Sequence, residues 1–189
     1  MEAFLISTGV VALGEMGDKT QLLALLLAAR FKRPWPIVWG IFGATIVNHA
    51  AAGAVGTWVA GALGPTLLRW VIGVLFIAMA AWILVPDKLD EGEARVSHFG
   101  AFTTTAIMFF LAEMGDKTQI ATIALAARFN DLLAVVAGTT LGMLIADVPV
   151  VFLGHRIAGR VSMRWVHGIA AMIFLLLGVL TLFNVGRLF

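Results

Sequence analysis

The chain has 189 residues, of which 61% are hydrophobic and only 13% are charged. Soluble domains are about half apolar, so this composition excludes an ordinary soluble domain and indicates a membrane protein. The formal net charge of +2 is too small to indicate nucleic-acid binding, and the absence of cysteine excludes disulfides and thiolate metal sites.

Six stretches are long and apolar enough to cross a bilayer as helices, which takes about 20 mostly apolar residues each. In chain order they cover residues 3–29, 36–62, 66–85, 99–127, 132–154 and 165–186. We therefore predict an all-α polytopic membrane protein with six transmembrane helices. The first stretch lacks the basic start of a cleaved signal peptide, so we expect it to be retained as a span.

The first predicted helix, 3–29, carries charged residues near the middle of the membrane. The sequence GEMGDKTQ places Glu15, Asp18 and Lys19 inside an otherwise apolar run. A continuous helix would put Glu15 and Asp18 on one face, with Thr20 pointing away from it. An ionised carboxylate at the bilayer centre costs at least about 2.5 kcal/mol, so these charges require a structural or functional reason.

The second predicted helix, 36–62, contains two adjacent polar residues, Asn48 and His49. Hydrogen bonding between helices explains an asparagine inside a span, although it could also support a site. A histidine could carry protons, but a hydrogen-bonded packing role is the simpler interpretation. The third predicted helix, 66–85, is followed by the charged segment 86–98, which we predict to be a linker.

The fourth predicted helix, 99–127, repeats the motif of the first. The sequence EMGDKTQ returns there and places Glu113, Asp116 and Lys117 at the matching positions. On a continuous helix Thr118, like its counterpart in the first copy, points away from the carboxylates. The chain therefore contains the same charged motif twice, each time inside an apolar stretch.

The fifth predicted helix, 132–154, carries Asp147 within a residue of the position that matches Asn48, and Pro149 follows it. A proline inside a helix breaks the hydrogen-bond ladder and frees carbonyl groups, so we favour a functional role for Asp147. The sixth predicted helix, 165–186, begins at the sequence RWVHG, which matches RWVIG near the start of the third with a small slip from the offset of the two motifs.

These matches divide the chain into a first three-helix repeat, 1–85, the linker 86–98, and a second three-helix repeat, 99–189. Because three is odd, the second copy must enter the membrane from the opposite face. The chain is therefore predicted to be an inverted repeat of the kind found in transporters, whose sites lie near the bilayer midplane between the two halves.

Basic residues predict the orientation of the chain. The loops after the first, third and fifth helices contain Arg30, Lys32, Arg33, Lys88, Arg95, Arg156, Arg160 and Arg164. The opposite side has only Arg69, Arg128 and Arg187. The positive-inside rule therefore predicts that both termini lie outside and that the linker is cytoplasmic.

The two motifs together predict an all-oxygen cage, the arrangement that hard divalent cations prefer. Its expected ligands are Glu15, Asp18, Glu113 and Asp116. Lys19 and Lys117 reduce the total charge to two negative charges, which one divalent cation or two protons would neutralise. Burial and crowding favour the protonated form of carboxylates, so the motif predicts exchange of a divalent cation for protons.

A local alternative is that Glu15 with Lys19, and Glu113 with Lys117, form salt bridges along one helix at the favourable spacing of four residues. This pairing would not exclude a site, because a lysine at the midplane needs an acidic partner. We keep both interpretations open.

Two further residue types flank the acids in each copy. Gln21 and Gln119 could bind a cation through the amide oxygen or only bridge helices. The thioethers of Met16 and Met114 would favour Mn²⁺ over Ca²⁺ as ligands. On a continuous helix a methionine points about 100° away from the glutamate, which favours packing unless the helix unwinds.

The paired motif and the two three-helix halves resemble the Gdt-type cation exchanger family, whose signature is Glu-x-Gly-Asp-Lys/Arg-Thr/Ser. The resemblance covers essentially the whole chain. It implies a Ca²⁺ or Mn²⁺ transporter that works by proton antiport without a prosthetic group, and its bacterial relatives export manganese. It places the functional acids at Glu15, Asp18, Glu113 and Asp116. It further implies a bacterial inner-membrane protein whose partners are a divalent metal ion and the lipid bilayer; oligomerisation is not indicated.

Two other classes share some of these features. A passive divalent cation channel would use the carboxylates but would not need the lysines or an inverted repeat. An intramembrane aspartyl protease uses one aspartate from each of two helices, in a Gly-x-Gly-Asp signature. Here glutamate replaces the first glycine in both copies, so we expect a transporter and not an enzyme.

Overall fold

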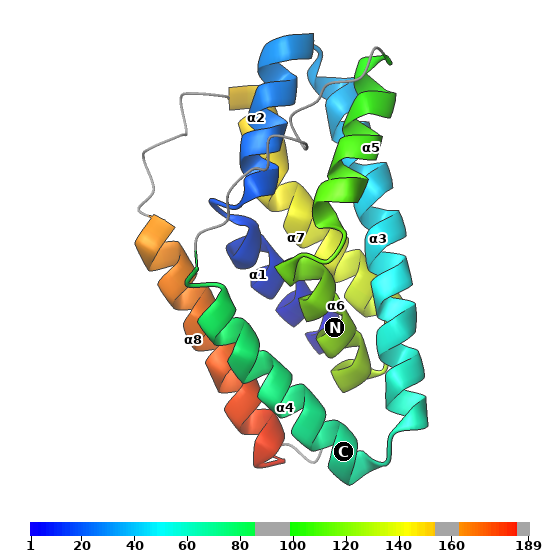
Figure 1. Ribbon diagram of the computed structural model, residues 1–189, viewed down its shortest axis with the longest axis vertical. Coiled ribbons are helices and arrows are strands. Elements are labelled where there is room, and N and C mark those ends of the chain that lie inside the picture. The colour runs from blue at the N-terminus through cyan, green and yellow to red at the C-terminus, as the bar shows by residue number, and fades with distance from the viewer. Residues whose placement is uncertain (86–98, 154–162, 185–189) are drawn as a thin grey trace.

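The computed structural model describes residues 1–85, 99–153 and 163–184, and this part of the chain is helical, with no strand (Figure 1). The predicted linker 86–98 lies outside it. The helices are α1 (Glu2–Glu15), α2 (Lys19–Phe31), α3 (Pro34–Ala62), α4 (Pro65–Trp82), α5 (Ala101–Glu113), α6 (Lys117–Phe129), α7 (Leu132–Leu153) and α8 (Met163–Leu182). The all-α fold class is confirmed.

Four helices are long and apolar enough to cross a membrane: α3, α4, α7 and, from Arg164 onward, α8. They correspond to the second, third, fifth and sixth predicted spans. The prediction of one continuous helix for each of the other two spans is wrong. Residues 3–29 form α1 and α2, and residues 99–127 form α5 and α6, with a break at the charged motif in both cases.

Two apolar clusters form the interior. One is built mainly by α1, α4, α6 and α8 around Phe76 and Phe174, whose ring centroids are 6.1 Å apart. The other is built mainly by α2, α3, α5 and α7 around Phe109 and Ile41. In Figure 1, α2 and α5 occupy the upper half of the molecule, and α1, α6 and the α4–α8 pair occupy the lower half. The breaks in the two motif segments therefore lie at mid-height.

Small residues allow the helices to pack closely. A Cβ atom at Gly138 or Gly142 of α7 would lie 2.5 Å from Phe4 O or 2.7 Å from Thr8 O of α1. Only glycine allows this contact, because no side chain then separates the two backbones. The close packing fixes α1, and the glutamate at its end, against α7.

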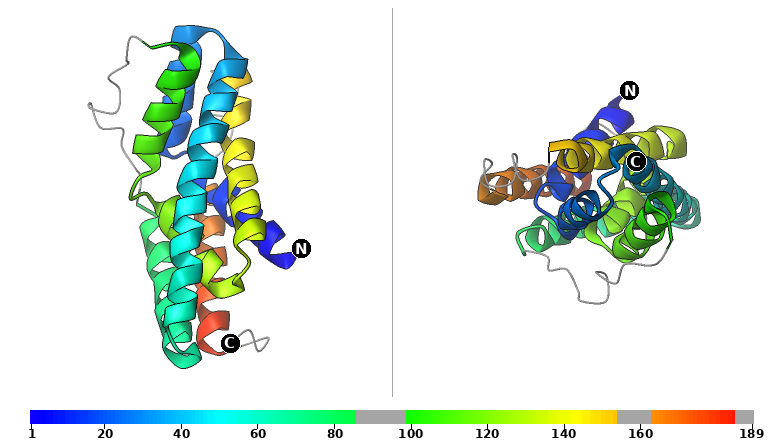
Figure 2. Two further views of the ribbon diagram at one scale, coloured as in Figure 1. Left: turned by 90° about the vertical axis from the view of Figure 1, so that its right-hand side faces the viewer. Right: turned by 90° about the horizontal axis from the view of Figure 1, so that it is seen from above.

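Corresponding helices of the two copies run in opposite directions (Figures 1 and 2). The α1–α2 segment rises through the molecule while α5–α6 descends, and α3 and α7 are likewise antiparallel. The last helices of the copies, α4 and α8, pack against each other in the lower half. Arg128, at the end of α6, is buried and donates from Nη1 to Thr181 Oγ1 of α8 at 2.9 Å, so it ties these helices together.

Candidate cation site

The first motif forms a tight turn that ends one helix and starts the next. Met16 has φ −64° and ψ 114°, Gly17 has φ 86°, and the Asp18 N–H donates to Glu15 O at 3.1 Å. These values define a type II β-turn, whose third residue needs a positive φ and is therefore usually glycine. Helix α1 ends at Glu15 because the chain turns there.

The second motif repeats this geometry. Met114 has φ −65° and ψ 119°, Gly115 has φ 76°, and the Asp116 N–H donates to Glu113 O at 3.2 Å. Asp116 is the N-cap of α6, just as Asp18 is the N-cap of α2. Since both copies have the same turn, the break belongs to the motif itself.

The turns redirect the threonines toward the glutamates. Thr20 Oγ1 donates to Glu15 Oε2 at 2.5 Å, and Thr118 Oγ1 donates to Glu113 Oε2 at 2.8 Å. The prediction that the threonines point away was wrong, because it assumed a continuous helix. Each glutamate is thus held by the threonine of its own motif, across the turn.

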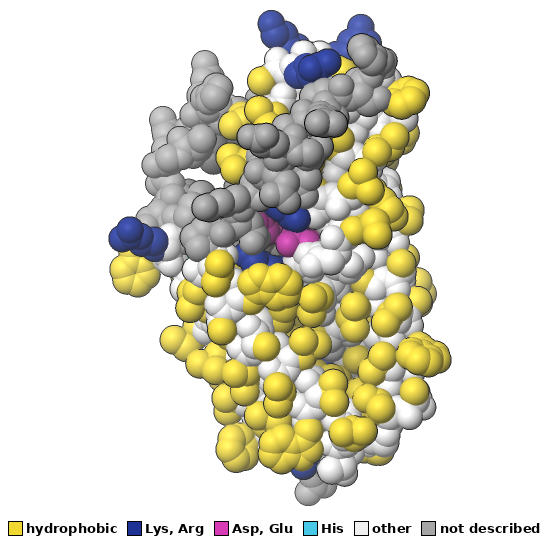
Figure 3. Space-filling model, viewed as in Figure 1, with side chains coloured by type: hydrophobic (Ala, Val, Ile, Leu, Met, Phe, Trp, Pro, Cys, Tyr) yellow, Lys and Arg dark blue, Asp and Glu magenta, His cyan; other side chains and the backbone are white. Residues whose placement is uncertain are grey.

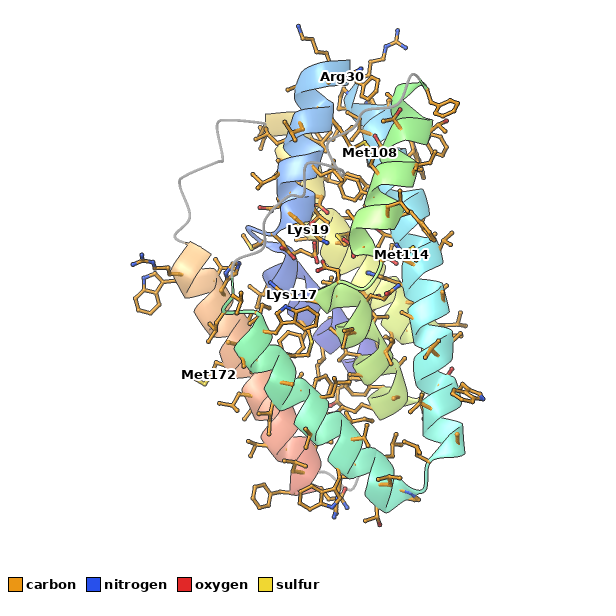
Figure 4. All side chains as sticks on the ribbon, viewed as in Figure 1. Lys19, Arg30, Met108, Met114, Lys117 and Met172 are labelled. Carbon is orange, nitrogen blue, oxygen red and sulfur yellow. The ribbon has the colours of Figure 1, made fainter. Side chains whose placement is uncertain are left out.

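The turns also change the expected partner of the first lysine. Lys19 Nζ lies 3.9 Å from Asp116 Oδ1, so this ion pair joins the two copies. The alternative of a Glu15–Lys19 pair along one helix loses its geometric basis, since α1 ends at the glutamate. Lys117 is buried, and its Nζ donates to Val85 O, just beyond α4, at 2.9 Å. Figure 4 shows both lysines extending toward the middle of the molecule.

The structure brings the predicted acids together. Glu15, Glu113 and Asp116 are buried and offer carboxylate oxygens that all lie within 4.8 Å of one another. Asp18, also buried, interacts electrostatically with both glutamates. Oε1 of each glutamate accepts no hydrogen bond from any described residue. Three carboxylates from the two copies are therefore placed to share one cation.

Asp147 of α7 is a fifth buried acid near this cluster. It interacts electrostatically with Glu15 and Glu113, and neither of its oxygens accepts a hydrogen bond within the described part of the chain. The expected break at Pro149 is absent, because α7 continues to Leu153. Neighbouring helices in a membrane protein support such a proline, so Asp147 reaches the site from an intact helix.

The glutamines support the turns. Gln21 Oε1 accepts from the Gly17 N–H at 2.9 Å, and its Nε2 donates to Ala146 O of α7 at 2.8 Å. Gln119 Oε1 accepts from the Gly115 N–H at 2.8 Å. Of the two roles considered for these residues, bridging is the one that the geometry shows.

The residues of α3 have different environments. Asn48 Nδ2 donates to Phe110 O of α5 at 3.0 Å, which is the interhelical bond expected of a packing asparagine. His49 is fully buried, but neither ring nitrogen has a hydrogen-bond partner among the described residues, so the hydrogen-bonded role expected for it is not found.

The methionines of the two motifs differ in exposure. Met16 is partly buried, whereas Met114 is 56% exposed. The packing role expected from a continuous helix therefore does not hold for Met114. In Figure 3, acidic and basic side chains reach the surface at mid-height of this face, next to a largely apolar surface.

One polar contact of the site was missed from the sequence. His167 Nε2 lies 2.8 Å from Met16 O, in the first turn. The signal in the sequence was a histidine inside an apolar span, where a polar side chain needs a partner.

Comparison with known proteins identifies the family. The chain matches the family described as divalent cation/proton antiporter GDT1 over residues 3–91 and 101–187. A protein of Vibrio cholerae serotype O1, named as a proposed manganese exporter, is 50% identical over 97% of this chain and 92% of its own length. A GDT1-like protein of Synechocystis is 31% identical, covering 96% of this chain and 97% of that protein.

The Saccharomyces cerevisiae divalent cation/proton antiporter GDT1 is 23% identical over 97% of this chain and 84% of that protein. No solved structure matches the chain. Each of the two matched ranges contains one copy of the motif, and the family consists of transporters, as expected from the sequence, and not of enzymes. The chain therefore belongs to the GDT1 family of divalent cation/proton antiporters.

Proposed function

We propose that this protein exports Mn²⁺ from the bacterial cytoplasm in exchange for protons, with Ca²⁺ as the alternative substrate. The observation that carries the proposal is the buried cluster of Glu15, Glu113 and Asp116, whose oxygens lie within 4.8 Å of one another. Oxygen ligands suit both cations. The manganese in the name of the Vibrio cholerae relative favours Mn²⁺.

Helix dipoles support a cation at this position. Glu15 and Glu113 are the last residues of α1 and α5, and the C-terminal end of a helix carries partial negative charge. Helices that break in mid-membrane and direct their C-terminal ends at a cation recur in secondary transporters. Two such ends meeting at one cluster would attract a divalent ion from both copies.

The arrangement of the helices supports the proposal of six spans in an inverted repeat. Each half-helix pair, α1–α2 and α5–α6, would cross the bilayer as one broken span, in addition to the four longer helices. Matching helices run in opposite directions (Figure 1), as an inverted repeat requires. We propose that the two copies rock against each other and expose the cluster to one side of the membrane at a time.

The charges of the cluster provide a reason for exchange. Four motif carboxylates and two lysines sum to two negative charges, and burial makes that excess costly unless a counter-charge is present. One divalent cation or two protons would supply the counter-charge. Binding of one would therefore release the other, which couples the two fluxes.

The proposed location is the bacterial inner membrane, with both termini outside and the linker 86–98 in the cytoplasm. In Figure 1, α1 begins and α8 ends in the lower half of the molecule, away from the connection between α2 and α3. That connection carries Lys32 and Arg33, both exposed, and the positive-inside rule places it in the cytoplasm.

Reconstitution in liposomes tests the proposal. An imposed pH gradient should drive Mn²⁺ against its own concentration gradient, and an imposed Mn²⁺ gradient should drive protons in the opposite direction. Mn²⁺ flux without coupled proton movement would indicate a passive channel and contradict the exchanger. Competition by Ca²⁺ in the same vesicles would decide between the two substrates.

A further inference from the structure

We propose that His167 is a positioning residue that locks the central peptide of the first turn, so that the two halves of the cation site are not mechanically equivalent. The inference rests on the proposed function, because it concerns the shape of the same cation site. Its basis is the 2.8 Å contact between His167 Nε2 of α8 and Met16 O.

The hydrogen bond between His167 and Met16 has only one possible direction. A backbone carbonyl oxygen only accepts hydrogen bonds, so Nε2 must carry the proton and donate to Met16 O. Since α1 ends at Glu15, this carbonyl lies outside the helical ladder. A partner from elsewhere in the protein stabilises such a carbonyl group, and α8 provides one for Met16.

The peptide concerned controls the type of turn. Types I and II of the β-turn differ by a flip of the central peptide, here the one that joins Met16 to Gly17. Glycine adopts positive and negative φ with similar ease, so Gly17 does not by itself select one form. Contacts on the two sides of the peptide must make the selection.

The first turn is held on both sides of this peptide. The Gly17 N–H donates to Gln21 Oε1 at 2.9 Å, and His167 donates to the carbonyl of Met16. A flip would break both bonds. Because the turn carries Glu15 at one end and Asp18 at the other, the lock also fixes the direction of both acids.

The second turn is held on one side only. The Gly115 N–H donates to Gln119 Oε1 at 2.8 Å, as in the first copy. The Met114 carbonyl accepts no hydrogen bond from any residue in the described ranges 1–85, 99–153 and 163–184. At the 98-residue offset that relates Glu15 to Glu113, the residue that matches His167 in the first repeat is Arg69, whose Nε has no hydrogen-bond partner among the described residues.

The consequence is a division of roles. The first turn is the rigid half of the site, and its carbonyl points at His167 and not at the cation. The second turn is the half that can reorient when a cation is exchanged for protons. Loss of the His167 bond should therefore lower cation affinity, because the first turn could then adopt forms in which Glu15 and Asp18 point in other directions.

The experiment compares His167→Ile, which removes the hydrogen-bond donor, with His167→Gln, which retains one. Mn²⁺ binding to the purified full-length chain is measured by calorimetry, and Mn²⁺-driven proton flux is measured in liposomes. We expect Kd and KM for Mn²⁺ to rise about five- to tenfold in His167→Ile, since one hydrogen bond is lost. Maximal flux should change by less than about twofold, and His167→Gln should recover most of the affinity.

Met172→Leu is the matched control, because this residue is on the same helix and is 66% exposed. If His167→Ile is not recovered as folded protein, His167→Asn replaces it, since the shorter amide cannot reach the carbonyl. The proposal would be overturned by an unchanged Kd for Mn²⁺ in His167→Ile, or in His167→Asn where that variant replaces it. It would also be overturned if His167→Gln bound Mn²⁺ as weakly as His167→Ile.

The two assays separate this inference from the proposed function. Mn²⁺ binding without coupled proton flux in the wild-type protein would contradict antiport, yet the Kd comparison would still decide the role of His167. Wild-type antiport with equal Kd values in all variants would contradict the role of His167 alone. Absence of Mn²⁺ binding by the wild-type protein would overturn both.

Discussion

Lys19 Nζ of the first motif lies 3.9 Å from Asp116 Oδ1 of the second motif. The two side chains are 15% and 5% exposed, so the pair is mostly removed from water. Because the pair crosses between the copies, the charge of one motif is balanced in part by the other. We therefore expect substitutions in one motif to affect the charges of both.

Replacing Lys19 by glutamine should strengthen cation binding and slow transport. Two unit charges about 4 Å apart interact by about 4 kcal/mol at an effective dielectric constant near 20. Desolvation offsets part of this energy, so we expect Kd for Mn²⁺ to fall about tenfold and the transport rate to fall with it. Arg30→Gln, at the exposed end of the same helix, should leave both unchanged. Weaker binding in Lys19→Gln would contradict the assigned role.

Replacing Asp18 or Asp116 by asparagine should abolish transport while the protein still inserts in the membrane. Loss of one buried charge from a paired cluster costs several kcal/mol, which corresponds to at least about a hundredfold in rate. Asp131→Asn is the control, since Asp131 is exposed and its Oδ1 accepts from the Ala134 N–H, a bond that asparagine can also accept. Wild-type flux in either motif variant would refute the site.

Replacing Gly17 or Gly115 by alanine should destabilise the turns. Their φ values of 86° and 76° cost a residue with a Cβ atom about 1–2 kcal/mol. We expect lower thermal stability and weaker Mn²⁺ binding, measured on the same preparations. Gly9→Ala is the control. A Cβ at this helical position meets no atom of another element within 4 Å, so the stability of this variant should equal or exceed that of the wild-type protein.

Replacing Thr20 or Thr118 by valine should weaken the site, whereas serine should preserve it. Each threonine hydroxyl donates to a buried glutamate, and a hydrogen bond to a charged group is worth about 1.5–3 kcal/mol. The valine variants should bind Mn²⁺ at least about tenfold more weakly. Equal affinity of the valine and serine variants would show that the hydroxyl is dispensable.

Mn²⁺ binding should depend steeply on pH. If one cation displaces two protons, its apparent Kd rises up to about 100-fold for each pH unit of acidification while both carboxyl groups are protonated. Stability of the cation complex is therefore lost as pH falls. The check is proton release into a weakly buffered solution during Mn²⁺ titration. Release of no protons at any pH would contradict the exchange mechanism.

The sequence predicted that the acids of the two motifs lie close together, which the structure shows, but not the geometry of the motifs, and the role of the acids as cation ligands stays a prediction. A continuous helix predicts Glu15 and Asp18 on one face, but the structure places them at the two ends of a turn. A type II turn separates them, with Gly17 at its third position. The Met-Gly pair in both copies was the signal for this turn, but the apolar residues on either side favoured an uninterrupted span.

The amino-acid sequence by itself determined that the protein is helical, that it is built from two matching halves, and that each half places the same acids in an apolar segment. These properties follow from composition, from the length of apolar runs and from repetition, all of which are local. Only the tertiary structure decided where the spans break, that Lys19 pairs with Asp116, and that His167 contacts the first turn. The physical reason is that charged and unpaired backbone groups in a membrane protein must find partners, and here those partners come from distant parts of the chain.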